Sequence, residues 1–147
     1  MRSFTYSGHI QRTPEQLFAY MLDFNNTPRW RSLVRKLEVV GGGPVRLGSE
    51  LRVSLDVMGE VRTTASEVWS FDPPRRLGLR NTASNITGQF EYSLSAERGG
   101  TLITFTCDIK PHGVMWLMLP FILRGHRARY ADQLDRLKRA AESAPDS

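Results

Sequence analysis

Apolar side chains recur at every second position over most of the chain between residues 34 and 109. This period of two is typical of strands that bury one face. It predicts strands over residues 34–40, 49–57, 61–71, 77–82, 86–94 and 102–109, preceded by a first strand over residues 5–10. The segments between the later strands are short, so we expect an antiparallel meander.

Two short helices are predicted between the first strand and the second. Thr13, Pro14 and Gln16 have the spacing of a capping box with proline at the first helical position. The helix that begins at Pro14 has one apolar face, made of Leu17, Phe18, Met21 and Leu22. Residues 23–26 interrupt it, and the pair Thr27-Pro28 can then cap a second short helix that carries Trp30.

The last part of the chain returns to a helical period. From Gly113 to about Ala141, apolar positions are three or four residues apart, which predicts one long helix with a buried stripe. Pro120 either kinks this helix or marks its true beginning. Residues 143–147 have the composition of a frayed tail, and residues 1–147 form a single domain in this interpretation.

The predicted order of elements is a strand, two short helices, about six antiparallel strands and a long helix, an α+β arrangement. We expect the sheet to curve around the C-terminal helix. Such a sheet bends away from the helix near its open end, and a cavity between the two is the consequence. The inward rows of the sheet and the C-terminal helix then supply the candidate ligand-binding residues, namely Leu55, Val57, Thr63, Ala65, Trp69, Leu79, Asn81, Phe90, Tyr92, Phe105, Cys107, Phe121 and Tyr130.

Glu67 is the candidate catalytic residue. It shares the face of Ala65 and Trp69 in the alternation, so we expect it to point into the cavity. A carboxyl in apolar surroundings has a raised pKa and can act as a general acid or base. The alternative is that the register differs by one residue and that Glu67 lies in solvent.

Two further side chains, Asn81 and Cys107, are candidates for a role in the site. Asn81 follows Leu79 on the inward face and either holds a ligand carbonyl or hydroxyl, or serves the turn together with Thr82. Cys107 behaves as a small buried hydrophobic residue, because no positive group at a fixed spacing would lower its pKa.

Three stretches of the sequence resemble one known superfamily. These are residues 8–18, which include the capping box, residues 23–30 with Trp30, and residues 134–138 in the last helix. Together with the order of elements, they are similar to the polyketide cyclase/dehydrase and lipid-transport superfamily, the START-like or SRPBCC group. The resemblance implies a helix-grip fold with a deep apolar cavity. Relatives use this cavity to bind lipids, sterols, hormones or polyketides, and some of them cyclise or hydrolyse the bound molecule.

The charge and the metal-binding residue types exclude several classes of function. The chain has 147 residues and a net charge of +5, but 17 of its 20 basic residues are arginines spread along the sequence. Because they form no patch interleaved with aromatic residues, we expect no nucleic-acid partner. One cysteine and three scattered histidines give no disulfide framework and no metal-ligand spacing, so we expect neither a metal nor a cofactor.

Residues 114–123 are apolar on all sides of a helix and allow two interpretations. Either they begin the long helix and close the cavity, or part of them is exposed as a portal, a dimer contact or a membrane-surface contact. The run is interrupted by Pro120 and is far shorter than the roughly 20 residues that cross a bilayer. The N-terminus lacks the apolar core of a signal peptide, so we expect a cytoplasmic location.

Three functions therefore remain in competition. The favoured one is a non-enzymatic binder of a hydrophobic small molecule or lipid. The alternative is a cyclase/dehydrase-like enzyme in which Glu67, Asn81 or Tyr92 moves a proton. The third is an interaction module that docks a protein or a membrane through residues 114–123.

Overall fold

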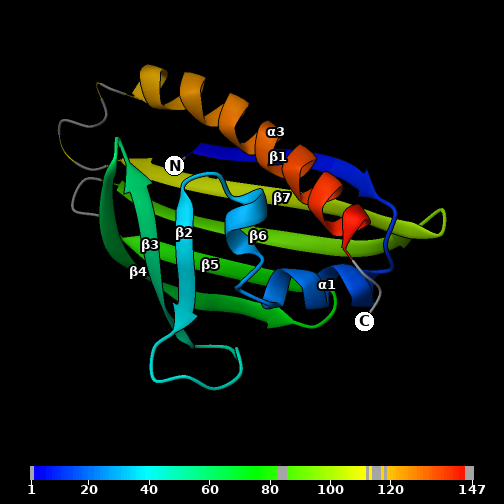
Figure 1. The fold of residues 1–147 in the computed structure, drawn as a ribbon. Helices are drawn as coiled ribbons and strands as arrows, with labels where there is room; N and C mark the ends of the chain where they lie inside the picture. Colours follow the sequence, from blue (N-terminus) through cyan, green and yellow to red (C-terminus); the bar gives the residue numbers. More distant parts are fainter. Residues whose placement is uncertain (1, 83–85, 112, 114–116, 118, 145–147) are drawn as a thin grey trace.

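Seven strands form one antiparallel sheet in the computed structural model, in the order β1-β7-β6-β5-β4-β3-β2 (Figure 1). The structure describes residues 2–82, 86–111, 113, 117 and 119–144, and of residues 2–3, 57, 82, 86–87, 110–111 and 119–130 it describes the backbone alone. The strands are β1 Arg2–Ile10, β2 Val34–Val39, β3 Glu50–Val57, β4 Glu60–Asp72, β5 Arg76–Thr82, β6 Ile86–Glu97 and β7 Gly100–Pro111. The predicted antiparallel meander is confirmed, and the first strand closes it by pairing with the last.

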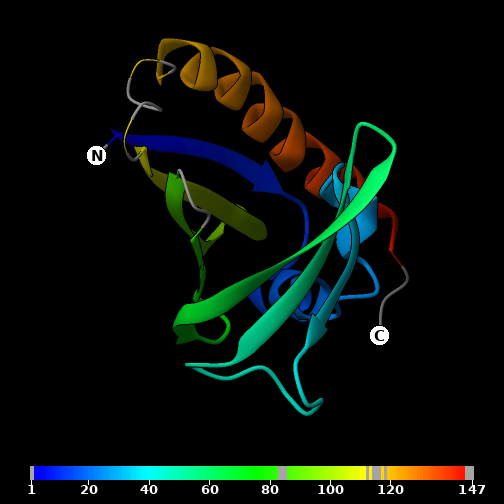
Figure 2. The same ribbon diagram turned by 90° about the vertical axis from the view of Figure 1, so that its left-hand side faces the viewer.

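Three helices accompany the sheet: α1 Pro14–Leu22, α2 Thr27–Trp30 and α3 Leu119–Ser143. The predicted capping box is present, since the Gln16 N–H donates to Thr13 Oγ1 and the Thr13 N–H donates to Gln16 Oε1, both at 3.1 Å. The long helix begins at Leu119, so Pro120 marks its beginning and does not kink it. Figure 2 shows the sheet curving around the side that α3 covers, which is the helix-grip arrangement that the sequence predicts.

The core lies between the concave face of the sheet and the helices. Residues opposite one another on neighbouring strands point to the same face, so the pairing register gives continuous rows across the sheet. One row runs through Phe4, Cys107, Phe90, Leu79 and Val68, and the next runs through Tyr6, Phe105, Tyr92, Leu77 and Phe71. These rows face inward, because most of their members are among the buried or partly buried hydrophobic residues of the core.

A β-bulge in β4 reverses the predicted alternation of that strand. Val68 pairs with Leu79 and Ser70 pairs with Gly78, so Trp69 is an extra residue on the β4 side. A bulge of this kind shifts the period of two by one position. Phe71 therefore faces inward, whereas Thr63, Ala65, Glu67 and Trp69, which precede the shift, do not.

The C-terminal end of α3 is tied to the corner between β1 and α1. Arg12 Nε donates to the carbonyl oxygen of Ala141 at 2.9 Å, and Arg12 Nη2 also donates to the carbonyl oxygen of Ala144. The last carbonyls of a helix lack the usual donor four residues on, and Ala141 accepts only a long backbone bond from the Ala144 N–H at 3.3 Å, so the guanidinium supplies donors where α3 ends. Nearby, the Gln11 N–H donates to a carboxylate oxygen of Glu142 at 2.8 Å.

Candidate functional site

Five aromatic rings form a cluster on the concave face of the sheet. We call Tyr6, Trp30, Phe90, Tyr92 and Phe105 the aromatic cluster. Their ring centroids are 5.0 to 6.4 Å apart in the contacting pairs, which suits tilted and edge-to-face packing. Four of the rings come from β1, β6 and β7, and α2 adds the fifth from above the sheet. The cluster thus lies on the concave face of the sheet and contacts α2.

One member of the cluster is fixed by a buried polar contact to α3. Tyr92 Oη donates to Gln133 Oε1 at 2.9 Å, and both side chains are buried. Gln133 lies in the C-terminal half of α3, so this bond fixes the helix relative to the middle of the sheet. Without this bond, the Tyr92 hydroxyl and the Gln133 amide oxygen would be buried without a hydrogen bond between them, which costs free energy.

Arg31 brings a positive charge to the same place. Arg31 follows α2 directly, and its Cζ lies 5.4 Å from the centre of the Phe90 ring. Phe90 faces inward, so the guanidinium lies on the concave side of the sheet. Arg31 Nε is buried and has no hydrogen-bond partner, and the same holds for Trp30 Nε1 and Tyr6 Oη.

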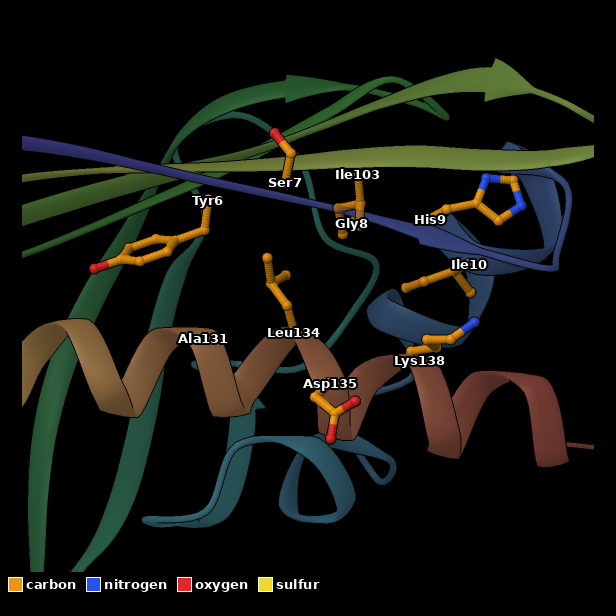
Figure 3. A pocket seen from close by; sticks show the side chains of 10 residues that line it. All are labelled: Tyr6, Ser7, Gly8, His9, Ile10, Ile103, Ala131, Leu134, Asp135 and Lys138. Atoms are coloured by element: carbon orange, nitrogen blue, oxygen red, sulfur yellow. The ribbon is translucent and has the colours of Figure 1, made fainter.

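A pocket of about 280 Å³ lies between β1 and α3 (Figure 3). Figure 3 shows Tyr6 and Ile10 of β1 and Leu134 of α3 between the strand and the helix, with Lys138 and Asp135 of α3 at the margin. Gly8 also lines it, and a Cβ built on this glycine meets no heavy atom within 4 Å. Tyr6 belongs to both the pocket and the aromatic cluster, so the two adjoin.

Seven of the predicted ligand-binding residues lie on the inner face. Leu55, Phe90 and Asn81 are only partly buried. The others are buried to 4% exposure or less and form part of the core, namely Leu79, Tyr92, Phe105 and Cys107. Asn81 pairs with Gly88 across the β5–β6 hairpin, and its Oδ1 lies 3.3 Å from the position of a Cβ on that glycine.

The candidate catalytic carboxylate is on the wrong face for its predicted role. Glu67 is exposed and pairs with Glu50 and Arg80, whose side chains are also exposed. Thr63 and Ala65 are exposed on the same outer face. The prediction that these residues line the cavity is wrong, because the alternation was extended through the bulge.

Trp69 also lies on the outer face. Its indole covers Gly78, and its Nε1 donates to the carbonyl oxygen of Phe90 at 3.2 Å. Arg80 stands over the ring, with its Cζ 6.0 Å from the centroid. The prediction that this side chain lines the cavity is therefore wrong for the same reason as for Glu67.

Cys107 has the environment of a core residue. Burial raises the pKa of its thiol to about 12, and the negative charge of Asp108 adds to the effect. A thiol with this pKa stays protonated at neutral pH and is a poor nucleophile. Among the described residues, no group of three His, Cys, Asp or Glu side chains could hold a metal ion.

Several predictions concern side chains outside the described part of the structure. These are Val57, Phe121 and Tyr130, together with most of residues 114–123. Within that last segment Leu117 is described and is 80% exposed. Among the described residues, no helix combines the length and the apolar character that crossing a bilayer requires.

The sequence matches one protein family, described as polyketide cyclase/dehydrase and lipid transport, over residues 1–142. The chain belongs to this family. Membership supports a role in binding a hydrophobic ligand or in cyclase-type chemistry and does not decide between the two. No curated protein matches the sequence.

Solved structures similar to this family member share its fold. A protein from Thermus thermophilus has a TM-score of 0.78 at 15% identity, with 99% of this chain and 100% of that chain covered. A START superfamily protein from Mycobacterium smegmatis has a TM-score of 0.65 at 14% identity, with 95% and 94% covered. The di-domain ARO/CYC StfQ from the steffimycin biosynthetic pathway has a TM-score of 0.76 at 13% identity, with 95% of this chain and 50% of StfQ covered.

The sequence interpretation missed the polar groups of the site. Trp30 ends a helix of four residues and Arg31 follows it, and this helix is too short for an apolar period to assign a face. Gln133 lies one position from the apolar residue Leu134, so only the three-dimensional position of α3 reveals that it is buried. The Thr-Pro pair that starts α2 was the single signal that a short helix would lie here.

Proposed function

We propose that this family member binds a hydrophobic small molecule or lipid between the sheet and α3. The observation that carries the proposal is the partial exposure of Phe90. This residue faces inward from β6, and β6 lies between β7 and β5 in the sheet. A side chain in this position can be reached only from the concave side. The interior is therefore not filled completely around the aromatic cluster, and apolar surface is left for a ligand to cover.

The polar groups of the interior support binding of a ligand that carries some polar atoms. Trp30 Nε1, Arg31 Nε and Tyr6 Oη are buried without partners. Binding sites for small molecules typically combine apolar walls with a few such groups, which orient the ligand. Glu67, the carboxylate that was the best candidate for proton transfer, is exposed on the outer face, and this favours a binder over an enzyme.

The test uses an uncharged fluorescent probe, N-phenyl-1-naphthylamine, and two neighbouring positions of β4. Ser66 pairs with Leu51 on the inner face, whereas Ala65 is exposed on the outer face. We expect saturable binding to the wild type and a Kd at least about tenfold higher for Ser66→Trp, because the indole occupies ligand space. The matched control Ala65→Trp should bind within about twofold of the wild type.

Circular dichroism melts of both variants establish that they remain folded. If the wild type shows no saturable binding of the probe, the proposed ligand binding is contradicted. Equal probe affinities of Ser66→Trp and the wild type would show that the ligand does not bind at this face of the sheet.

Cyclase-type activity is the second candidate, supported by the fold shared with the ARO/CYC protein StfQ. On the inner face, Asn81 and Tyr92 are the predicted proton-transfer residues that remain. The Tyr92 hydroxyl already donates to Gln133, so a catalytic role would require this bond to rearrange. Turnover of a polyketide-like substrate that survives in Tyr92→Phe would exclude this residue from the chemistry.

A further inference from the structure

We propose that Arg31 selects ligands that carry a carboxylate, so that the hydrophobic molecule bound between the sheet and α3 is an organic acid. This inference rests on the proposed binding function and adds the chemical class of the ligand. It follows from the position, the surroundings and the hydrogen-bonding capacity of one side chain.

The first observation is where the charge lies. The Arg31 guanidinium stands over the Phe90 ring on the concave side, 5.4 Å from Cζ to the centroid. Phe90 in turn touches Tyr92 and Phe105 at centroid distances of 5.7 and 5.6 Å. A cation is thus held beside the apolar surface that the ligand would cover, and the ring face gives it partial compensation.

The second observation is that the cation has no anionic partner. Among the described residues, the Arg31 side chain forms no ion pair and no hydrogen bond, although its Nε is buried. A guanidinium nitrogen that is buried without an acceptor is unfavourable, because its N–H has lost its hydrogen bond to water and has formed no other. An anion from outside the chain would remove this deficit.

The outer face of the sheet provides the contrast. Arg80 also lies over an aromatic ring, that of Trp69, with Cζ 6.0 Å from the centroid. However, Arg80 is exposed and is directly opposite Glu67 in the sheet. Water and a carboxylate are therefore available to Arg80, and only the inner arginine needs a charge from a ligand.

The type of hydrogen bond that is missing narrows the ligand class. Arginine Nε and tryptophan Nε1 can only donate, so Arg31 and Trp30 together require acceptors. The Nε–H and one Nη–H of a guanidinium form a planar fork that matches the two oxygens of a carboxylate. The Tyr6 hydroxyl, also buried and unpartnered, borders the same cluster and can donate to a further ligand oxygen.

The inferred ligand therefore has two parts. A flat or flexible apolar body covers Phe90 and the neighbouring rings, and a carboxylate at one end pairs with Arg31. A neutral molecule of the same shape would fill the apolar space and leave the guanidinium without a partner. Discrimination between acid and alcohol is thus the property to measure.

The experiment uses N-phenyl-1-naphthylamine as the reporter and two competitors that share one ring system, 2-naphthoate and 2-naphthalenemethanol. For the wild type, we expect the acid to displace the reporter at a concentration at least about tenfold below that of the alcohol. In Arg31→Met, which keeps an unbranched apolar stem without the guanidinium and its charge, the two competitors should differ by no more than about twofold. The matched control Arg80→Met should keep the full preference of the wild type.

Arg31→Lys provides a second variant, because it keeps the charge and loses the fork. Its preference for the acid should fall between those of the wild type and Arg31→Met. If Arg31→Met does not fold, the wild type and Arg31→Lys still decide the question. A wild type that binds acid and alcohol equally, or an Arg31→Met that keeps the preference, overturns the inference.

The two proposals fail in different ways in this assay. A wild type that does not bind the uncharged reporter contradicts ligand binding itself. A wild type that binds the reporter and shows no preference for the acid contradicts only the role of Arg31.

Discussion

The contact between Trp69 and Gly78 gives the sharpest prediction about stability. Gly78 lies in β5 opposite the bulge of β4, and the Trp69 indole covers it. A Cβ at this position would lie 2.8 Å from Trp69 Cε2 and Nε1 and 2.9 Å from Ser70 Cβ. These separations are below van der Waals contact, so Gly78→Ala must push the indole away from the sheet.

The expected loss can be worked out from three contributions. Overpacking costs about 1–3 kcal/mol, and the bond from Trp69 Nε1 to the Phe90 carbonyl, 3.2 Å long, adds about 1 kcal/mol if it breaks. Alanine in place of glycine returns about 0.5–1 kcal/mol, because it restricts the unfolded chain. The free energy of unfolding should fall by about 1–3.5 kcal/mol, which lowers Tm by about 3–10 °C for a domain of this size.

Urea unfolding followed by circular dichroism measures this loss, and Gly8→Ala is the matched control. Gly8 also lies in a strand, but a Cβ there meets no heavy atom within 4 Å. Its free energy of unfolding should be unchanged or should rise by up to about 1 kcal/mol. If Gly78→Ala unfolds within about 0.5 kcal/mol of the wild type, Trp69 does not lie over β5 and the bulge assigned to β4 is incorrect.

Three further outcomes follow from individual contacts. Thr13→Ala removes the cap of α1 and should reduce the free energy of unfolding by about 1 kcal/mol, whereas Thr13→Ser should retain most of it, and equal losses in both would refute the capping role. Tyr92→Phe leaves Gln133 Oε1 without its donor and should cost about 1–2 kcal/mol; an unchanged urea midpoint would contradict the buried bond. Cys107 should react with 5,5′-dithiobis(2-nitrobenzoate) at pH 8 only as fast as the protein unfolds, and rapid labelling of the folded protein would contradict its burial. The raised pKa of Cys107 also predicts a pH dependence of stability. The thiol has a pKa of 9.0 in the unfolded chain and about 12 in the folded protein, so it ionises first in the unfolded chain, and the free energy of unfolding should decline as pH rises above about 9.

Much of the fold could be predicted from local patterns. The capping box at Thr13 and the alternation in β3, β5, β6 and β7 are short-range signals, and the structure contains the elements they predict. Burial of one face per strand then requires a second layer over that face, and the long C-terminal helix is the predicted element that can supply it. The resemblance to the START-like superfamily agreed with this arrangement from the outset.

The candidate site was harder to predict, and β4 explains part of the difficulty. Trp69 and Phe71 are both large and apolar and stand two residues apart, as on one face of a regular strand. The extra residue at the bulge puts Trp69 on the outer face and Phe71 on the inner face. Val68, which is fully buried, was the residue that continued the true inner row.

Arg31 was missed for a different reason. It belongs to no periodic segment, and its position over Phe90 depends on how α2 packs against the sheet and α3. An arginine after a short helix is normally expected in solvent. Only the contact with an inward-facing ring of a distant strand identifies it as an interior group.

The attachment of Arg12 to the end of α3 also determines how the interior can open. Arg12 holds carbonyl oxygens of the last helical turn, and Glu142 is bound to the backbone of Gln11, so this end is a fixed pivot. The helix has 25 residues and is therefore about 38 Å long. A swing of about 10° around the pivot would move Leu119 by about 6–7 Å. This displacement is comparable to the space that a flat aromatic ring needs between two surfaces that it contacts. Entry of a ligand can thus be a lever motion in which the contacts at the C-terminal turn stay intact, while the bond from Tyr92 to Gln133, farther along α3, has to open.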